Sequence, residues 1–137
     1  MYINKAKAIK KYNNTEISAS LTKSSFEIVE AVLIELQRSM EIVSEISIQK
    51  KIEEKDRIRR NSNFSKACTA IYALQTSLDF EKGGSIATKL FQVYEFCRKQ
   101  LIKAFTKKVV EGIKRAISTL NYIIIAWKEL NGKNATN

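Results

Sequence analysis

The sequence predicts an all-α protein, an antiparallel four-helix bundle with an N-terminal arm. The chain of 137 residues has no proline, four glycines and 45% apolar residues, a composition that excludes both a disordered chain and a turn-rich β architecture. Apolar residues recur at spacings of three and four in four segments with short connections, as expected for amphipathic helices of one domain. We therefore expect an arm at residues 1–23, a bundle at 24–131 and a flexible tail at 132–137.

The arm and the first helix differ in their apolar content. Residues 1–25 carry isolated apolar side chains, among them Tyr12 and Ile17, which are too few for a core of their own. The segment is either laid on the bundle or a frayed terminus. A first helix is predicted at residues 24–49, followed by a break at 53–56, where Asp56 is suited to be the N-cap of the second helix.

The other three helices follow from their apolar stripes. In the expected corner between the second and third helices, Gly83 takes a left-handed conformation and Ser85 caps the next helix. Cys68 and Cys97 fall on stripes, so each is expected to be a small buried apolar residue. The stripe residues are Phe64, Ala67, Cys68, Ile71, Leu74, Gln75 and Leu78 in the second helix; Ile86, Leu90, Val93, Cys97, Leu101 and Ala104 in the third; and Val109, Ile113, Ile117, Leu120, Ile124 and Trp127 in the fourth.

The corner also carries a family resemblance. The supporting residues, in order, are Tyr12, Ala19-Ser20, Lys66-Ala67, Leu74-Gln75, Ser77-Leu78-Asp79, Lys82-Gly83-Gly84, Ile86-Ala87, Leu90, Tyr94, Ala104 and Ala126-Trp127. In this order and spacing the chain resembles the flagellin secretion chaperones, the FliS family, from Tyr12 to Trp127. It departs from the family at Leu21, where a proline is usual, and at Ile28-Val29, where leucine and tyrosine are usual.

The resemblance implies a function and a partner. A FliS-type chaperone is a cytoplasmic export protein whose apolar grooves bind the disordered C-terminal segment of flagellin, which prevents premature polymerisation. Its N-terminal arm, including the tyrosine matched by Tyr12, lies over part of that surface. Other flagellar export or regulatory proteins are further partners that this resemblance allows.

Apolar residues left over after the stripes are filled indicate where a partner binds, because a contiguous apolar patch usually marks an interface. These residues are Tyr72, Phe80, Phe91, Tyr94, Phe96, Ile102, Tyr122, Ile123 and Ile125. Widening of the core or burial against the arm is the alternative, chiefly for Tyr94 and Ile125, whereas Phe91, Tyr72 and Ile123 favour a partner surface. A homodimer would use such a patch too. Combined with the corner and the arm, they give the predicted partner-binding set, which is Tyr12, Ile17, Leu78, Phe80, Ile86, Leu90, Phe91 and Tyr94.

Several functional classes are disfavoured. The chain has no histidine, the commonest general base and metal ligand, and its two cysteines are far apart in sequence, so we expect no enzyme, no metal and no cofactor. Asp79 and Glu81 alone are too few for a metal site. The N-terminal lysines precede no apolar run, and the longest apolar run, residues 122–127, is too short to cross a bilayer. We expect a cytoplasmic protein that is not inserted in a membrane.

The basic charge leaves one alternative from a different class. The chain has a net charge of +10, with −4 on residues 26–49 and +6 on residues 98–115. Seven cations around Phe105, namely Arg98, Lys99, Lys103, Lys107, Lys108, Lys114 and Arg115, are suited to binding phosphates, so a basic bundle that binds nucleic acid is the alternative. Lys107 and Lys108 are unexpected at the start of the fourth helix, where the helix dipole disfavours cations. Since no known nucleic-acid-binding motif is visible, the sequence favours a protein partner.

Overall fold

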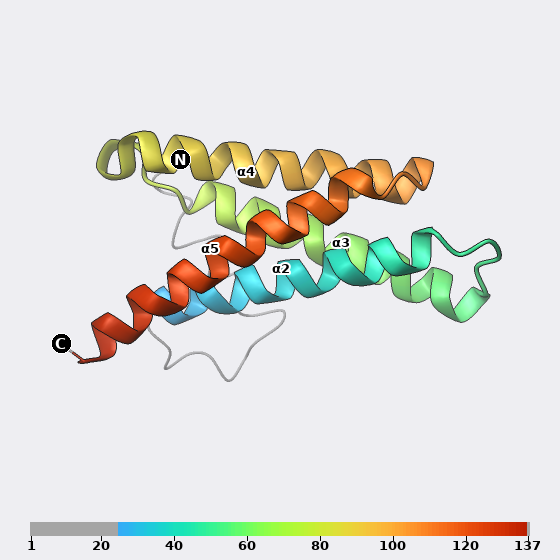
Figure 1. The fold of residues 1–137 in the computed structure, drawn as a ribbon, viewed down its shortest axis with the longest axis horizontal. Helices are drawn as coiled ribbons and strands as arrows, with labels where there is room; N and C mark the ends of the chain where they lie inside the picture. The colour runs from blue at the N-terminus through green and yellow to red at the C-terminus, as the bar shows by residue number, and fades with distance from the viewer. Residues whose placement is uncertain (1–24, 137) are drawn as a thin grey trace.

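The computed structural model describes residues 25–136, and this part of the chain folds into four helices. They are α2 (Ser25–Ser47), α3 (Glu54–Thr76), α4 (Phe80–Lys107) and α5 (Glu111–Thr136). Successive helices run antiparallel and are joined by residues 48–53, 77–79 and 108–110 (Figure 1). The predicted all-α four-helix bundle is confirmed. The arm at 1–23 lies outside the described residues, and α5 continues past its predicted end at residue 131.

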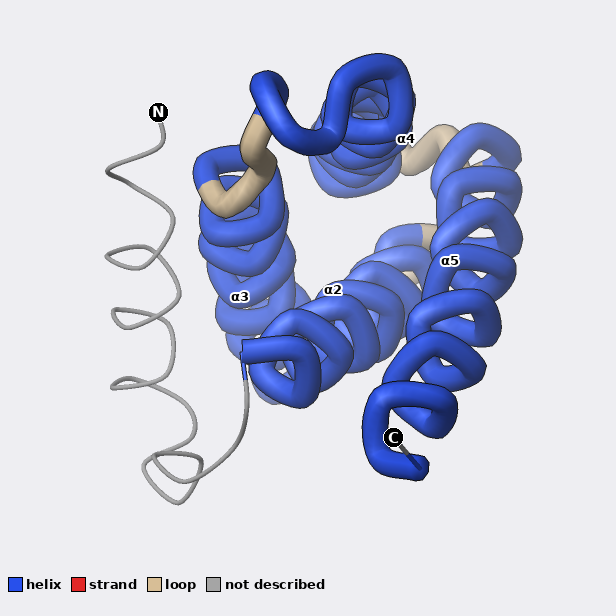
Figure 2. The backbone as a smooth tube through the Cα atoms, turned by 90° about the vertical axis from the view of Figure 1, so that its left-hand side faces the viewer, coloured by secondary structure: helices blue, strands red, loops and turns tan. Residues whose placement is uncertain are grey.

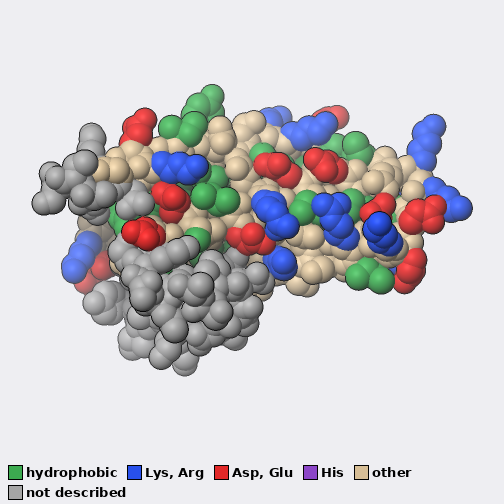
Figure 3. Space-filling view, turned by 90° about the horizontal axis from the view of Figure 1, so that it is seen from below, with side chains coloured by type: hydrophobic (Ala, Val, Ile, Leu, Met, Phe, Trp, Pro, Cys, Tyr) green, Lys and Arg blue, Asp and Glu red, His purple; other side chains and the backbone are tan. Residues whose placement is uncertain are grey.

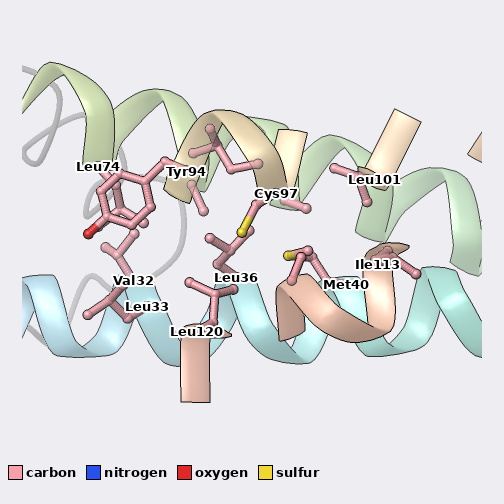
Figure 4. Packing of buried hydrophobic residues seen from close by; sticks show 14 of the residues in the cluster. Val32, Leu33, Leu36, Met40, Leu74, Tyr94, Cys97, Leu101, Ile113 and Leu120 are labelled. Atoms are coloured by element: carbon pink, nitrogen blue, oxygen red, sulfur yellow. The ribbon is translucent and has the colours of Figure 1, made fainter. Parts of the chain in front are cut away.

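Helix α2 makes the most extensive contacts of the four helices. It contacts α3, α4 and α5, and the end-on view shows the four helices arranged around a shared interior (Figure 2). Side chains of α2 such as Leu33, Leu36 and Met40 are completely buried there. Figure 4 shows them meeting Tyr94, Cys97 and Leu101 from α4 and Ile113 and Leu120 from α5. Every helix therefore contributes one apolar face to a single core.

The most extensive contact joins α2 and α3. Ala67, Ala70 and Ala73 of α3 are all buried, and such small side chains let two helix backbones approach closely. Lys66 of α3 also lies 4.0 Å from the carboxylate of Glu35 in α2. By contrast, the outer surfaces carry charges of both signs, which alternate on the face seen in Figure 3.

The corner between α3 and α4 differs from its prediction. Helix α3 ends at Thr76, and the carboxylate of Asp79 caps α4 by accepting hydrogen bonds from the backbone N–H groups of Glu81 (3.1 Å) and Lys82 (3.0 Å). The glycine with a positive φ is Gly84, with φ 50° and ψ −127°. The predicted break at the double glycine is therefore present one residue later than expected, at Gly84 instead of Gly83. The side chain that caps a helix at this corner is Asp79 and not Ser85, because the Asp79 carboxylate satisfies free N–H groups one turn earlier.

The starts of α3 and α5 also differ from those predicted from the sequence. Glu53, not Asp56, occupies the N-cap of α3, where it makes no side-chain capping bond. Asp56 lies in the first helical turn, where a carboxylate is still favoured by the helix dipole. Val109, expected on the fourth helical stripe, lies in the connection before α5 and is exposed.

Lys107 and Lys108 lie at the end of α4 and not at the start of the following helix. Lys107 is the last residue of α4, and Lys108 follows in the left-handed conformation, with φ 58° and its N–H bonded to the Ala104 carbonyl oxygen at 3.1 Å. Cations are favoured at a helix C-terminus. The helix dipole therefore explains the position of both lysines, which was unexplained with the predicted helix boundary.

Replacing Gly84 with alanine is expected to lower the free energy of unfolding by about 1–3 kcal/mol, because φ 50° with ψ −127° is a conformation that side chains with a Cβ avoid. Chemical denaturation measures the change. Gly132→Ala is the control, since an added Cβ there meets no atom within 4 Å. Equal stability of Gly84→Ala and the wild type would show that the corner relaxes into another conformation.

Candidate binding groove

A groove of about 360 Å³ opens beside the α3–α4 corner. Its walls come from the start of α2, the end of α3, the corner with the start of α4, and Trp127 of α5. Most of the lining side chains are apolar: Phe26, Val29, Leu74, Leu78, Ile86, Ala87, Leu90, Tyr94 and Trp127. Ser25, Ser77, Asp79, Lys82 and Gly83 complete the lining. An apolar groove between helices is a surface that accepts an amphipathic segment.

Four of the predicted site residues line this groove. Leu78, Leu90 and Tyr94 pack on the core, whereas Ile86 is 68% exposed. Tyr94 is only 2% exposed, and this burial raises the pKa of its phenol well above the ordinary value. Tyr94 is thus a core residue whose surface forms part of the groove, while Ile86 is the exposed apolar side chain at its edge.

The other four predicted residues are not part of the lining. Phe80 and Phe91 pair with each other on α4, with ring centroids 6.0 Å apart. Phe91 remains 36% exposed, so the pair offers a second apolar surface next to the corner. Tyr12 and Ile17 lie outside the described residues.

The groove wall formed by Phe26 and Trp127 was not predicted from the sequence. Phe26 and Trp127 stack with ring centroids 4.5 Å apart, and the indole Nε1 of Trp127 donates a hydrogen bond to the Phe26 carbonyl oxygen at 2.9 Å. Trp127 was placed on a helical stripe, whereas Phe26 at the start of α2 was assigned no role. Their pairing joins positions 101 residues apart, which periodicity within one helix cannot reveal.

Polar contacts hold α3 against α4 beside the groove. The side-chain amide of Gln75 donates to the Phe91 carbonyl oxygen (3.4 Å) and to Oε1 of Glu95 (3.2 Å). Arg98 binds the same carboxylate through Nε at 3.0 Å and through Nη2. These bonds, first from Arg98 and then from Gln75, lower the pKa of Glu95 to about 2. The network fixes the backbone that carries Phe91.

Neither of the two cysteines lines the groove. Cys97 is fully buried, and desolvation raises its pKa to about 12. Burial also raises the pKa of Cys68, although Arg98 opposes the shift. Within residues 25–136, no three His, Cys, Asp or Glu side chains are grouped to hold a metal ion. None of the helices described is long and apolar enough to cross a membrane.

The Glu95 network predicts a pH-dependent contribution to stability. Because the folded-state pKa of about 2 lies below the ordinary value of 4.5, this contribution is complete well above pH 4.5 and is lost as the pH falls towards 2. Glu95→Gln should therefore destabilise the protein at neutral pH and flatten the loss of stability across this window. Urea denaturation at several pH values measures both effects. An unchanged pH slope in the variant would show that other carboxylates dominate.

The fold and the groove are those of a helical-bundle binding protein, since the groove is apolar and lies between helices. The family described as "Flagellar protein FliS" matches residues 5–134, and the chain belongs to this FliS family. It is 32% identical over 83 residues to the "Flagellar secretion chaperone FliS" of Salmonella typhimurium strain LT2. That match covers 60% of this chain and 62% of the relative. No solved structure matches the chain.

Proposed function

We propose that this protein is a cytoplasmic flagellar export chaperone, and that its groove binds the disordered C-terminal segment of flagellin. The observation that carries the proposal is the apolar groove beside the α3–α4 corner in a chain of the FliS family. Support also comes from the Salmonella relative, which is a flagellar secretion chaperone by name. The proposed activity is non-covalent and requires no cofactor.

The groove provides what an amphipathic guest helix needs. Apolar anchors at spacings of three and four along the guest would bury against Leu78, Leu90 and the Phe26–Trp127 wall. Ordering a disordered guest costs conformational entropy, which offsets part of the gain from apolar burial. Binding is therefore reversible, as release for export requires, while the occupied groove keeps the guest segment from assembling.

The structure gives less support to nucleic-acid binding. Phe105, the aromatic residue within the basic cluster, stacks on Phe64 with centroids 4.1 Å apart and lies under the Arg60 guanidinium at 4.6 Å. Its ring is therefore occupied by the protein and is not available for stacking on a base. Arg98 is engaged by Glu95. A homodimer through the exposed residues Tyr72, Phe91 and Tyr122 is a further alternative.

Titration calorimetry with a peptide of the cognate flagellin C-terminus tests the proposal directly. We expect binding that persists from low to moderate salt, with a negative heat-capacity change from apolar burial. Trp127 is the one tryptophan of the chain and lines the groove, so its fluorescence gives a second readout. A scrambled peptide is the control. Absence of binding, together with salt-sensitive binding to DNA, would overturn the proposal in favour of the alternative.

Replacing Ile86 with aspartate is expected to weaken peptide binding by about tenfold or more, because burial of a large aliphatic side chain contributes about 1.5–3 kcal/mol. Ile86 is 68% exposed in the free protein, so the fold should remain intact. Tyr122→Asp is the matched control, since Tyr122 is 75% exposed on α5 and does not line the groove. Calorimetry and circular dichroism compare both variants, and equal affinities would exclude the groove as the binding site.

A further inference from the structure

A second distinct surface lies at the end of the bundle opposite the groove. The connections 48–53 and 108–110 both lie at this end, on the right in Figure 1. The contacts of Phe105 with Phe64 and Arg60 join the first half of α3 to the end of α4. We call residues 48–60 and 103–115 the basic end.

Most of the net charge of the protein lies at the basic end. Its two segments contain eleven lysines and arginines and four acidic residues, a net charge of +7 out of the +10 of the chain. The groove end, taken as residues 25–31, 76–89 and 127–130, contains three lysines and five acidic residues, a net charge of −2. The bundle is therefore electrostatically polar along its length.

The cations at the basic end are largely unneutralised. Among the described residues, the ion pair within this end joins Arg57 to Glu54. Arg60 is half-buried against Phe105, and its Nε has no hydrogen-bond partner. The other nine cations are exposed and belong to no ion pair in the described part of the chain. They are Lys50, Lys51, Lys55, Arg59, Lys103, Lys107, Lys108, Lys114 and Arg115.

Exposed aliphatic side chains accompany these cations. Ile48 is 54% exposed, Ile58 is 60% exposed and Val109 is 42% exposed. Ile48 precedes Lys50 and Lys51 in one connection, and Val109 follows Lys108 in the other. Cations with aliphatic tips suit a surface of anionic lipid, where the cations meet headgroup phosphates and the aliphatic groups enter the interface. A platform for single-stranded nucleic acid would instead present free aromatic rings, and a duplex would gain nothing from the aliphatic tips.

We propose that the basic end docks on a membrane surface rich in anionic lipids. The cations of both connections bind headgroup phosphates, and Ile48 and Val109 enter the interfacial layer. Docking in this pose directs the groove, at the opposite end of the bundle, away from the membrane. The proposal does not depend on flagellin binding, because the two surfaces share no residues.

Vesicle sedimentation with the full chain tests this proposal. Vesicles of equal parts phosphatidylglycerol and phosphatidylcholine should bind the protein in a salt-sensitive manner, whereas phosphatidylcholine alone should not. The triple variant Lys51→Gln, Lys107→Gln, Lys114→Gln should bind at least about tenfold more weakly. Lys89→Gln, Lys99→Gln, Lys128→Gln carries the same change in net charge outside both the basic end and the groove lining, and should lose less than about twofold.

A second variant separates a membrane from other polyanions. Ile48→Ser with Val109→Ser should weaken vesicle binding severalfold and leave any binding to double-stranded DNA unchanged. Equal losses in the two lysine triple variants would overturn the proposal, because net charge alone would then explain the binding. DNA binding without vesicle binding would also overturn it. The flagellin-peptide titration, repeated on each variant, reports separately on the groove.

Discussion

The burial of α2 against three other helices is the constraint on which the rest of the structure depends. Leu33, Leu36 and Met40 have no exposed surface, and the core around them is completed by residues of α3, α4 and α5. Because α2 and α3 pack most extensively, α4 and α5 complete the enclosure from the other side. Only one face of α2 is covered, since Ile34 is 39% exposed, and the candidate groove accordingly includes Phe26 and Val29 of α2 together with residues of α3, α4 and α5.

The groove exists because α3, α4 and α5 do not fully cover α2 at one end of the bundle. Helix α3 stops at Thr76, and Asp79 restarts the chain as α4 after a connection of residues 77–79. Gly84 then bends the first turn of α4 away from the regular helical path. Leu78 and Ile86 flank this bend and line the same groove as Phe26 and Trp127. The backbone conformation at the corner thus determines the shape of the groove, whose other walls come from α2, α3 and α5.

Periodicity in the sequence predicted the four helices and much of the core, because apolar spacing within one helix reports directly on its buried face. Ala67, Cys97 and Leu120 are buried as their stripes predicted. Helix ends were less predictable, since Asp79, Gly83 and Ser85 each suit a helix boundary and only the tertiary structure selects among them. The Phe26–Trp127 wall could not be predicted, because it depends on the relative placement of α2 and α5.

The groove and the basic end are expected to respond differently to salt. Apolar burial in the groove is largely insensitive to ionic strength, whereas attraction between the basic end and phosphate groups weakens as salt screens it. The groove end is slightly acidic, with a net charge of −2 over residues 25–31, 76–89 and 127–130, so an anionic surface repels it weakly and attracts the basic end. The same long-range field would therefore orient the bundle before contact, with its groove open to a guest chain.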